Sequence, residues 1–355
     1  MKGHKNSHIN RSWQALGCLL LLCACAEVID LGTEFGPTNL LVYGRFTNGL
    51  YGNTIELAQT SPFNARQDPI GGARINLVKE NGDRQPYVET EEGTYVLFDR
   101  SSLGQPGQTY YIEMTLASGE RYESEPAVMP NKVSQDYIDW KARTQVIPVR
   151  NGAAIVRNVV EFSMRTEIFD PEEEPLIRWN LMETYWLAEY PRVRLQGDPP
   201  LRCFVTKTVD VQDVLFYDGS ELRATEIAPR TMLARKHDSI FYDSYWFHAI
   251  QSSLTPDAFR FWQQVEDVAN RQGSIFDTPL GPIRSNVFNV NNPGERVLGY
   301  FEVAHVDTTR VFIDDNDIHF RVKRPCIPGT PYEPPECWDC LVLEGATKDI
   351  PYWMD

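Results

Sequence analysis

Four cysteines in the body of the chain are the residues whose type and spacing most directly indicate chemistry. They are Cys203, Cys326, Cys337 and Cys340, and the last two are spaced Cys-x-x-Cys, as in many zinc and redox sites. Zinc sites of this kind usually have a second Cys-x-x-Cys or paired histidines, and the sequence has neither. A redox-active pair normally opens a helix in a βαβ unit. We favour two disulfides over the zinc alternative, and expect no metal and no cofactor.

Loop size restricts how these cysteines can pair. A bridge between Cys337 and Cys340 would close a very small loop, which tends to be strained and easily reduced. We therefore expect Cys203 and Cys326 each to pair with one of those two cysteines. A bridge from Cys203 would close a span of about 130 residues and would strongly restrict the unfolded chain.

A fifth cysteine, Cys25, ends an apolar run over residues 13–24 that follows a basic N-terminal stretch. The run is about half of the ~20 residues that a membrane-spanning helix needs, so it is typical of a signal peptide. It ends in Leu22-Cys23-Ala24-Cys25, which resembles a lipobox with Leu at −3, a small residue at −1 and an acceptor cysteine. Cys23 is the poorer acceptor because the bulky Leu22 would occupy position −1.

These features predict a signal peptide over residues 1–24 and a tether over residues 25–38 that carries an acyl anchor on Cys25. The alternative is a short buried helix with incidental cysteines. Glu27 and Asp30 follow the acceptor cysteine and resemble the surface-export signal of Bacteroidota lipoproteins. We therefore expect a lipid anchor in the outer membrane, with the cell surface favoured over the periplasmic face.

Charge excludes one large class of partner. The net charge is −15, and loss of Lys2, Lys5 and Arg11 with the signal peptide would take it to −18. A nucleic-acid-binding protein needs a basic surface to neutralise phosphates, so no nucleic-acid partner is expected. A body of this charge lying flat on anionic lipid would be repelled as well.

No catalytic motif stands out in the sequence. Four histidines follow the predicted signal peptide and none forms an HExxH motif or a close pair, and there is no Gly-x-Ser-x-Gly elbow and no phosphate-binding loop with its lysine. The acidic run 314–317 lacks the Gly and Glu of a calcium loop and favours a solvated turn. We therefore expect that the protein is not an enzyme.

Aromatic residues gather in two runs, and their role is open. They are Trp179, Tyr185, Trp186 and Tyr190 in the first run, and Phe241, Tyr242, Tyr245, Trp246 and Phe247 in the second. A stacking platform for sugar rings or a peptide is one interpretation. Core and rim of a β-structure is the interpretation that we favour, because alternation along a strand directs half of each run inward.

The elements that must position these residues are mainly strands. Short alternating segments separated by turn residues such as Asn81-Gly82 predict a β-sandwich over residues 39–130. A second β-rich domain is expected over residues 131–323, with one amphipathic helix at about 256–272 that Thr255 caps. Residues 324–355 form a Cys- and Pro-rich C-terminal tail without a period. The predicted fold class is therefore mainly β, with two domains.

Several stretches together resemble a known family. Residues 25–31, the run from Gly71 through residues 93–96 to 106–111, residues 274–279, residues 298–301 and the tail from Cys337 to Trp353 are similar to Bacteroidota lipoproteins of domain of unknown function 4249. The first domain also resembles the carboxypeptidase-regulatory or transthyretin-like sandwich. The resemblance covers nearly the whole mature chain, implies no activity, and implies gene neighbours that encode TonB-dependent outer-membrane receptors.

Two functions from different classes follow from these observations. The first is a non-enzymatic accessory subunit of a TonB-dependent transporter, and the second is a free-standing glycan- or peptide-binding or adhesion module, with the ligand unknown in both. Residues 274–286 contain apolar Ile275 and Phe276 and the turn-forming Pro279 and Pro282. We expect this segment to be a contact loop, with packing beneath the second domain as the alternative.

Overall fold

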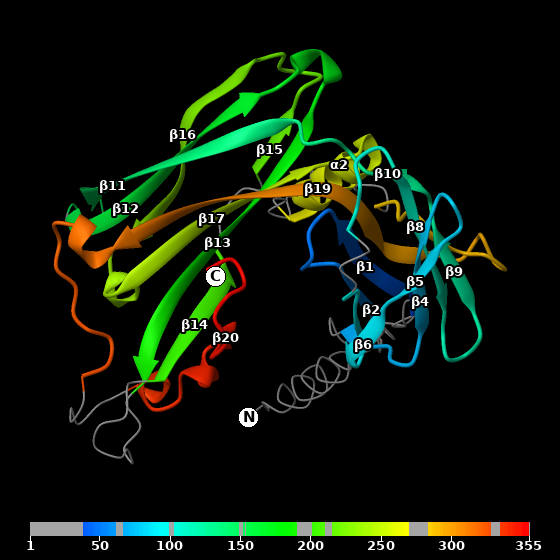
Figure 1. The fold of residues 1–355 in the computed structure, drawn as a ribbon, viewed down its shortest axis with the longest axis horizontal. Helices are drawn as coiled ribbons and strands as arrows, with labels where there is room; N and C mark the ends of the chain where they lie inside the picture. The colour runs from blue at the N-terminus through cyan, green and yellow to red at the C-terminus, as the bar shows by residue number, and fades with distance from the viewer. Residues whose placement is uncertain are drawn as a thin grey trace, which may run out of the picture. The chain divides into compact units, whose positions relative to one another are not determined.

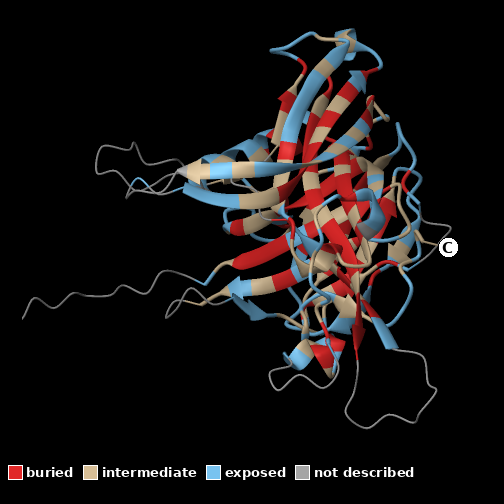
Figure 2. Cartoon of the chain, turned by 90° about the vertical axis from the view of Figure 1, so that its left-hand side faces the viewer, coloured by how far each residue is buried: buried red, intermediate tan, exposed pale blue. Residues whose placement is uncertain are grey.

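The computed structural model describes residues 38–354 except for 62–66, 99–102, 149–151, 153, 190–200, 210–214, 270–282 and 328–333. The described part is mainly β with a single α-helix, which confirms the predicted fold class (Figure 1). None of the helices within these ranges is long and apolar enough to span a bilayer. Buried residues are concentrated along the middle of the strands (Figure 2).

The largest sheet has eleven strands. Its main path is β20 (Ala346–Thr347), β14 (Leu201–Thr208), β13 (Leu176–Glu189), β17 (Ser244–Ser253), β19 (Val297–Asp314), β1 (Leu40–Thr47), β2 (Thr54–Thr60), β7 (Thr94–Val96) and β6 (Val88–Glu91). Beside this path, β15 (Leu215–Asp218) pairs with β13 and β3 (Gln67–Pro69) pairs with β2. β1 and β19 run parallel, with Leu40 opposite Val297. Strands far apart in the sequence therefore share one sheet.

A second sheet of six strands covers part of the first. It contains β18 (Val287–Asn289), β9 (Arg121–Ser124), β8 (Thr109–Thr115), β4 (Arg74–Lys79) and β5 (Arg84–Pro86) in order, with β10 (Ala127–Val128) beside β8. The turn between β4 and β5 has Gly82 at φ +86°, so the predicted Asn81-Gly82 hairpin is confirmed.

Aliphatic and aromatic side chains from both sheets meet in one core, which includes Phe46, Ile55, Leu77, Ile112 and Phe301. Phe301 comes from β19, so a strand beyond residue 290 completes the sandwich that the sequence predicts for residues 39–130. The residues that the structure describes within the ranges Thr38–Ser61 and Ala65–Asp355 belong to one compact unit.

A third sheet consists of three long strands, β11 (Ser134–Pro148), β12 (Ala154–Ile168) and β16 (Glu226–Lys236). Its apolar residues pack against β13 and β17 in a second core, where Phe162 stacks on Phe247 at 4.2 Å between ring centroids. The aromatic residues Trp179, Tyr245 and Phe247 of the two sequence runs are buried here. The burial of these three residues supports the interpretation of the two aromatic runs as parts of the core.

The helix, α2 (Pro256–Ala269), lies within the range that the sequence predicts. Thr255 caps it, because its hydroxyl accepts a hydrogen bond from the Ala258 amide at 3.2 Å. Phe261 stacks on Tyr300 of β19, and Phe259 meets Phe216 of β15 edge-on. α2 therefore covers one part of a face of the large sheet and leaves the rest of that face to other elements.

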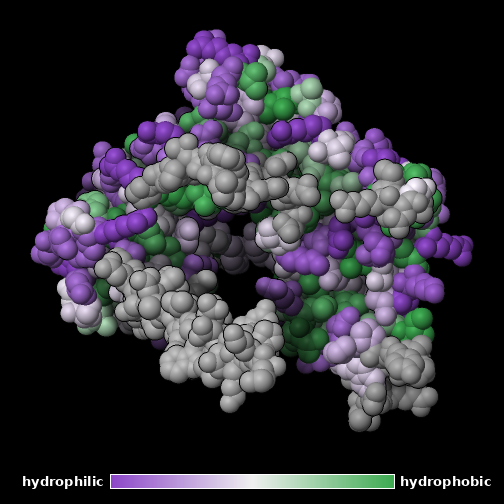
Figure 3. Space-filling model, turned by 180° about the vertical axis from the view of Figure 1, so that it is seen from behind, coloured by the Kyte–Doolittle hydropathy of each residue, from purple (hydrophilic) through white to green (hydrophobic). Residues whose placement is uncertain are grey.

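The remaining elements are short 3₁₀ helices, some of them in the tail. They are η3 (Pro171–Glu173), η4 (Ser239–Phe241), η5 (Asp315–Asp317), η6 (Pro335–Cys337) and η7 (Cys340–Val342). On the face of the molecule shown in Figure 3, hydrophilic and hydrophobic side chains of the described residues are interspersed.

Candidate functional site

A cavity of about 380 Å³ lies over the large sheet, beyond the part that α2 covers. Side chains from three paired strands form its floor. Met182 of β13 lies opposite His248 of β17, and His248 lies opposite Arg310 of β19. Residues directly opposite each other in a sheet project from the same face, so these side chains form one row across three strands. The lining consists of Arg45, Thr47, Tyr51, Gly52, Met182, Thr206, His248, Ile250, Val306, Thr308, Arg310, Tyr352 and Trp353.

The C-terminal residues Tyr352 and Trp353 supply an aromatic wall. Tyr352 stacks on Tyr51 with 4.0 Å between ring centroids, and Trp353 meets His248 edge-on at 4.8 Å. Trp353 also contacts Trp246 at 5.8 Å, which ties it to the second aromatic run. The flat rings and the apolar Ile250 give the cavity a largely apolar surface, the usual character of a small-molecule site.

Two disulfides hold the tail that carries this wall. Cys203 is bonded to Cys340 and Cys326 to Cys337, which confirms that Cys203 and Cys326 each pair with one member of the Cys-x-x-Cys motif. The buried Glu189 adds a further link, because the Cys340 amide donates a hydrogen bond to its carboxylate at 3.0 Å. β20 then pairs with β14 and directs the chain toward the cavity.

Glu189, Cys203 and Cys340 are the one group of described residues with metal-ligating atoms close enough for a shared ion, all within 4.8 Å of one another. The two sulfurs are bonded to each other, and a disulfide sulfur is not the thiolate that zinc requires. The oxidised chain therefore offers no complete metal site at this position. The Cys-x-x-Cys motif serves here as an anchor for the C-terminal wall.

The cavity carries positive charge. Arg45 and Arg310 line it, and no carboxylate belongs to its lining. Arg310 lies 5.0 Å from the ring centroid of Trp353 and has no carboxylate partner within salt-bridge distance among the described residues. Burial lowers the pKa of Arg310, although the neighbouring Tyr352 and Asp307 oppose this effect. A chain with a net charge of −15 thus has a cationic recess.

His248 is a weak base in this setting. Burial, assisted by the charge of Arg310, lowers its pKa to about 4. Its Nε2 atom lies 2.8 Å from the hydroxyl of Thr184, a fully buried side chain. A general base works best when its pKa is near the working pH, so this imidazole is poorly suited to proton abstraction at neutral pH.

Arg45 connects the cavity to a buried charge cluster. Its Nε atom lies 3.1 Å from the Glu302 carboxylate, which also accepts a hydrogen bond from the Trp262 indole at 2.5 Å. Arg178 approaches Glu302 to 3.2 Å and stacks on the Trp262 ring at 3.8 Å. Burial alone would raise the pKa of Glu302, but Arg178 and Arg45 hold it below its ordinary value. The cluster therefore fixes the orientation of Arg45.

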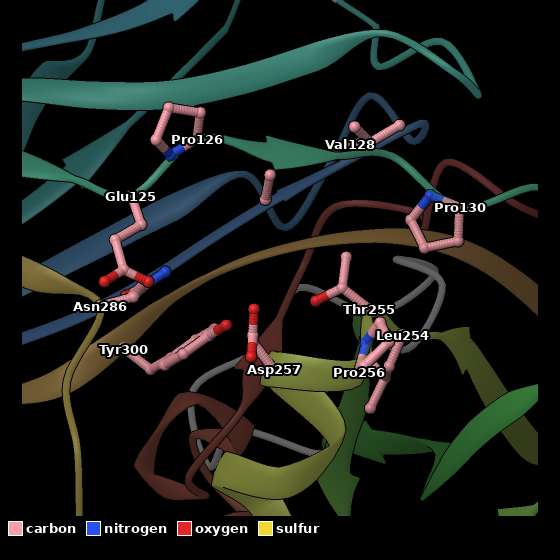
Figure 4. A pocket seen from close by; sticks show the side chains of 11 residues that line it. Glu125, Pro126, Val128, Pro130, Leu254, Thr255, Pro256, Asp257, Asn286 and Tyr300 are labelled. Carbon is pink, nitrogen blue, oxygen red and sulfur yellow. The ribbon is translucent and has the colours of Figure 1, made fainter.

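A second cavity, of about 400 Å³, lies at the start of α2 (Figure 4). Glu125, Asp257 and Tyr300 project into it, but each carboxylate already has a cationic partner. Arg284 lies 3.0 Å from Glu125, and Arg260 pairs with Asp257. This cavity is lined by satisfied charges and is the weaker candidate for a binding site.

Several residues that the sequence singles out lie outside the described ranges. They are Cys25, Tyr190, Ile275, Phe276, Pro279 and Pro282, so the lipid anchor and the contact loop stay predictions. The sequence did not identify Arg310, Tyr352 or Trp353, because an isolated arginine and an aperiodic tail carry no pattern. The Cys-x-x-Cys motif within the tail was the sequence signal that the tail is held in place.

A family model matches most of the chain. The model is described as a domain of unknown function (DUF4249), and it matches residues 27–310. Arg45, His248 and Arg310 lie within the matched range, whereas Tyr352 and Trp353 lie beyond it. No curated protein sequence matches the chain.

Proposed function

The chain belongs to the family that shares this domain of unknown function, DUF4249, and from this premise we propose that it is a lipid-anchored, non-enzymatic binding protein of the cell envelope. In this proposal Cys25 carries the lipid in the outer membrane, and the protein acts as an accessory partner of a TonB-dependent transporter. The cavity over the large sheet is its ligand-binding site, which we call the ligand cavity.

The observation that carries the proposal is the chemistry of that cavity. It combines two arginines, no carboxylate, and a wall formed by Tyr51, Tyr352 and Trp353. Flat rings provide stacking surface, and guanidinium groups provide forked donors for carboxylate or phosphate oxygens. A small ligand that has an anionic group beside a flat ring would satisfy both features. His248, with a pKa of about 4, supports binding rather than catalysis.

The predicted lipid anchor supports the partnership with a transporter. A tether over residues 25–38 would keep the body within a short distance of any barrel in the same membrane. The effective concentration of the partner would then be high, so a modest interface would be sufficient. The gene neighbourhood that the family resemblance implies points to the same class of partner.

Affinity purification tests this proposal. The full chain with a C-terminal tag is expressed in its native host, extracted in mild detergent and cross-linked, and the bound proteins are identified by mass spectrometry. We expect a TonB-dependent receptor to co-purify with the wild type and to be lost with Cys25→Ala, which should also lose acyl labelling. A wild-type protein that purifies without any barrel protein would refute the transporter partnership.

One observation favours the alternative function, a free-standing glycan- or peptide-binding module. Tyr51 and Tyr352 form a stacked pair, and 48% and 53% of their surfaces are exposed. Exposed rings of this kind are suitable for stacking against sugars. The same purification separates the two functions, because a free-standing module would retain its ligand-binding activity while purifying without a receptor.

A further inference from the structure

A third cavity, of about 310 Å³, lies on the large sheet. Strands β1, β2, β13 and β19 and the helix α2 contribute its lining, and Arg45 is the one described residue that also lines the ligand cavity. We call it the junction cavity, because its lining comes from both sides of the point where β19 changes its pairing partner from β1 to β17. Its volume is at the lower end of the range for small-molecule sites.

A buried charge cluster forms a fixed wall of the junction cavity. Glu302 lies opposite Arg45 in the register of β1 and β19 and 3.1 Å from its Nε atom. The same carboxylate pairs with Arg178 at 3.2 Å and accepts a hydrogen bond from the Trp262 indole. The side chains of Arg178 and Glu302 are 5% and 3% exposed. A buried network of this kind is rigid, so the wall is in place before a ligand arrives.

Three other side chains of the lining remain available to a ligand. Tyr43 of β1 is 39% exposed and lies opposite Glu56 of β2, so the two project from the same face of the sheet. Glu56 is exposed, and no cation among the described residues lies within salt-bridge distance of it. Asn180 follows Arg178 by two positions in β13 and therefore projects from the same face of that strand. The cavity thus offers an aromatic surface, a carboxylate acceptor and an amide.

The charges that line the junction cavity cancel. It has two arginines and two glutamates, which are Arg45, Arg178, Glu56 and Glu302, whereas the ligand cavity has two arginines and no carboxylate. Arg178 is engaged by Glu302 and stacks on the Trp262 ring at 3.8 Å, so it is not free to receive a ligand carboxylate. An anion would lie near Glu56, and a cation would lie near the two guanidinium groups. A neutral ligand meets neither repulsion.

We propose that the junction cavity binds one ring of a neutral saccharide. A sugar ring has an apolar face that can stack on Tyr43 and a rim of hydroxyls that both donate and accept hydrogen bonds. Glu56 accepts from such hydroxyls, and the amide of Asn180 can both donate and accept. An apolar ring of the same size would cover these two polar side chains without pairing them, which is costly. The polar partners therefore select the saccharide among neutral ligands.

The inference goes beyond the proposed function, because it concerns a different cavity and a ligand of different charge. The ligand cavity requires an anionic group for its arginines, whereas the junction cavity requires hydroxyls for a carboxylate and an amide. Neither the predicted lipid nor a transporter enters the argument.

Saturation-transfer-difference NMR of the full chain tests the proposal. The probes are three neutral sugars, methyl β-glucopyranoside, methyl β-galactopyranoside and methyl α-mannopyranoside. We expect at least one of them to bind. Its strongest saturation should fall on the protons of one ring face, because that face stacks on an aromatic side chain.

Matched variants identify the site. Tyr43→Ala should weaken binding of that sugar about fivefold through loss of stacking. Asn180→Ala should weaken it about fivefold through loss of a neutral hydrogen bond, and Glu56→Ala at least about tenfold, because its acceptor is charged. The control is Glu173→Ala, which removes an exposed carboxylate of η3 outside the lining and should leave binding unchanged. Urea unfolding verifies that each variant is folded.

Three results would overturn the proposal. The first is the absence of saturation for all three sugars. The second is a sugar signal that Tyr43→Ala, Glu56→Ala and Asn180→Ala all leave unchanged, which would place the sugar elsewhere. The third is stronger saturation of L-alanine or methylammonium that Glu56→Ala removes, which would show a site for a charged ligand. None of these results bears on co-purification of a receptor or on anion binding in the ligand cavity, so the proposals fail independently.

Discussion

The two ends of the described chain differ in what they bury. The described residues between 38 and 130 include no buried Asp, Glu, Arg or Lys, and their core is formed by aliphatic and aromatic side chains with a few small polar groups. Every buried charged residue among those described lies after position 130. These residues are Asp136, Glu161, Arg178, Glu183, Glu189 and Glu302. All four cysteines that form disulfides also lie there.

We call residues 38–130 the first region and the residues after position 130 the second region. The difference shows that the sequence specifies the folds of these two regions in different ways. An apolar core requires only the right period and volume, so many pairings of strands would satisfy it. A buried charge requires one particular partner, because a charge without a partner is costly away from water. The second region therefore depends on a small number of specific contacts, and one of them, the cluster of Arg178, Glu302 and Arg45, borders the ligand cavity.

The largest expected effect is on the disulfides of the second region. In the loop-entropy model, removing Cys203–Cys340, which spans 137 residues, should lower the free energy of unfolding by about 5 kcal/mol. Removing Cys326–Cys337, which spans 11 residues, should lower it by only about 3 kcal/mol. Urea unfolding of the two double Cys→Ser variants measures both values. Equal losses would show that chain entropy does not set the order.

The next effect tests the buried charges themselves. Glu183 accepts hydrogen bonds from Arg235 at 2.8 Å and from the Tyr245 hydroxyl at 2.8 Å. Glu183→Ala should cost about 3–5 kcal/mol, because it leaves a guanidinium and a buried phenol without their acceptor. In Glu183→Met combined with Arg235→Met and Tyr245→Phe, which leaves neither the guanidinium nor the phenol without an acceptor, most of that loss should be recovered, as measured by urea unfolding.

A matched control lies in the apolar sandwich. Leu77→Ala, at a fully buried position of β4, should cost about 3 kcal/mol through lost burial and the cavity that it leaves. No second substitution that removes a partner should restore this stability, because the loss is not a broken pair. The proposed difference between the two regions would be wrong if a second substitution restored the stability of Leu77→Ala. It would also be wrong if the combined substitutions at Glu183, Arg235 and Tyr245 restored none of the lost stability.

Features that depend on residues close together in the chain could be predicted from the sequence. Local signals were sufficient for the Asn81-Gly82 turn, for α2 with its Thr255 cap, and for the exclusion of a bridge between Cys337 and Cys340. Each of these depends on residues close together in the chain or on the geometry of a small loop.

The long-range pairings could not be predicted. Alternation in β1 and β19 shows that each strand has a buried face, but it does not show that Leu40 lies opposite Val297. The ligand cavity depends on that kind of information, because Arg45, His248, Arg310 and Trp353 come from four separate segments. Residue type alone gave no reason to bring them together.

A pH-dependent effect of intermediate size should be found at the cavity. The pKa of His248 is about 4, below the 6.5 of a free imidazole. Between these values the unfolded chain binds more protons than the folded chain, so the free energy of unfolding falls as the pH falls. His248→Gln should remove roughly 2–3 kcal/mol of this loss between pH 7 and pH 4, by urea unfolding. An unchanged pH profile would contradict the lowered pKa.

The smallest effect on stability, and the most specific one on binding, is expected at Arg310. Arg178 belongs to a cluster with Glu302, whereas Arg310 contacts Trp353 and has no carboxylate partner among the described residues. Arg310→Gln should therefore change the free energy of unfolding by less than about 1 kcal/mol, the size of an exposed cation–π contact. A side chain that contributes so little to folding is free to bind a ligand anion.

Fluorescence titration of the full chain with 1-naphthoate, a flat ring that bears a carboxylate, measures this role through quenching of tryptophan emission. Arg310→Gln should weaken binding at least about tenfold, because a charge-assisted hydrogen bond is lost. The matched control is Arg230→Gln, which removes a guanidinium 5.6 Å from the Trp179 ring and outside the cavity lining. It should bind naphthoate as the wild type does, and the uncharged 1-naphthamide should not distinguish Arg310→Gln from the wild type. If Arg310→Gln retained wild-type affinity for naphthoate, the cavity would not be an anion site, and the second region would use its charges for folding alone.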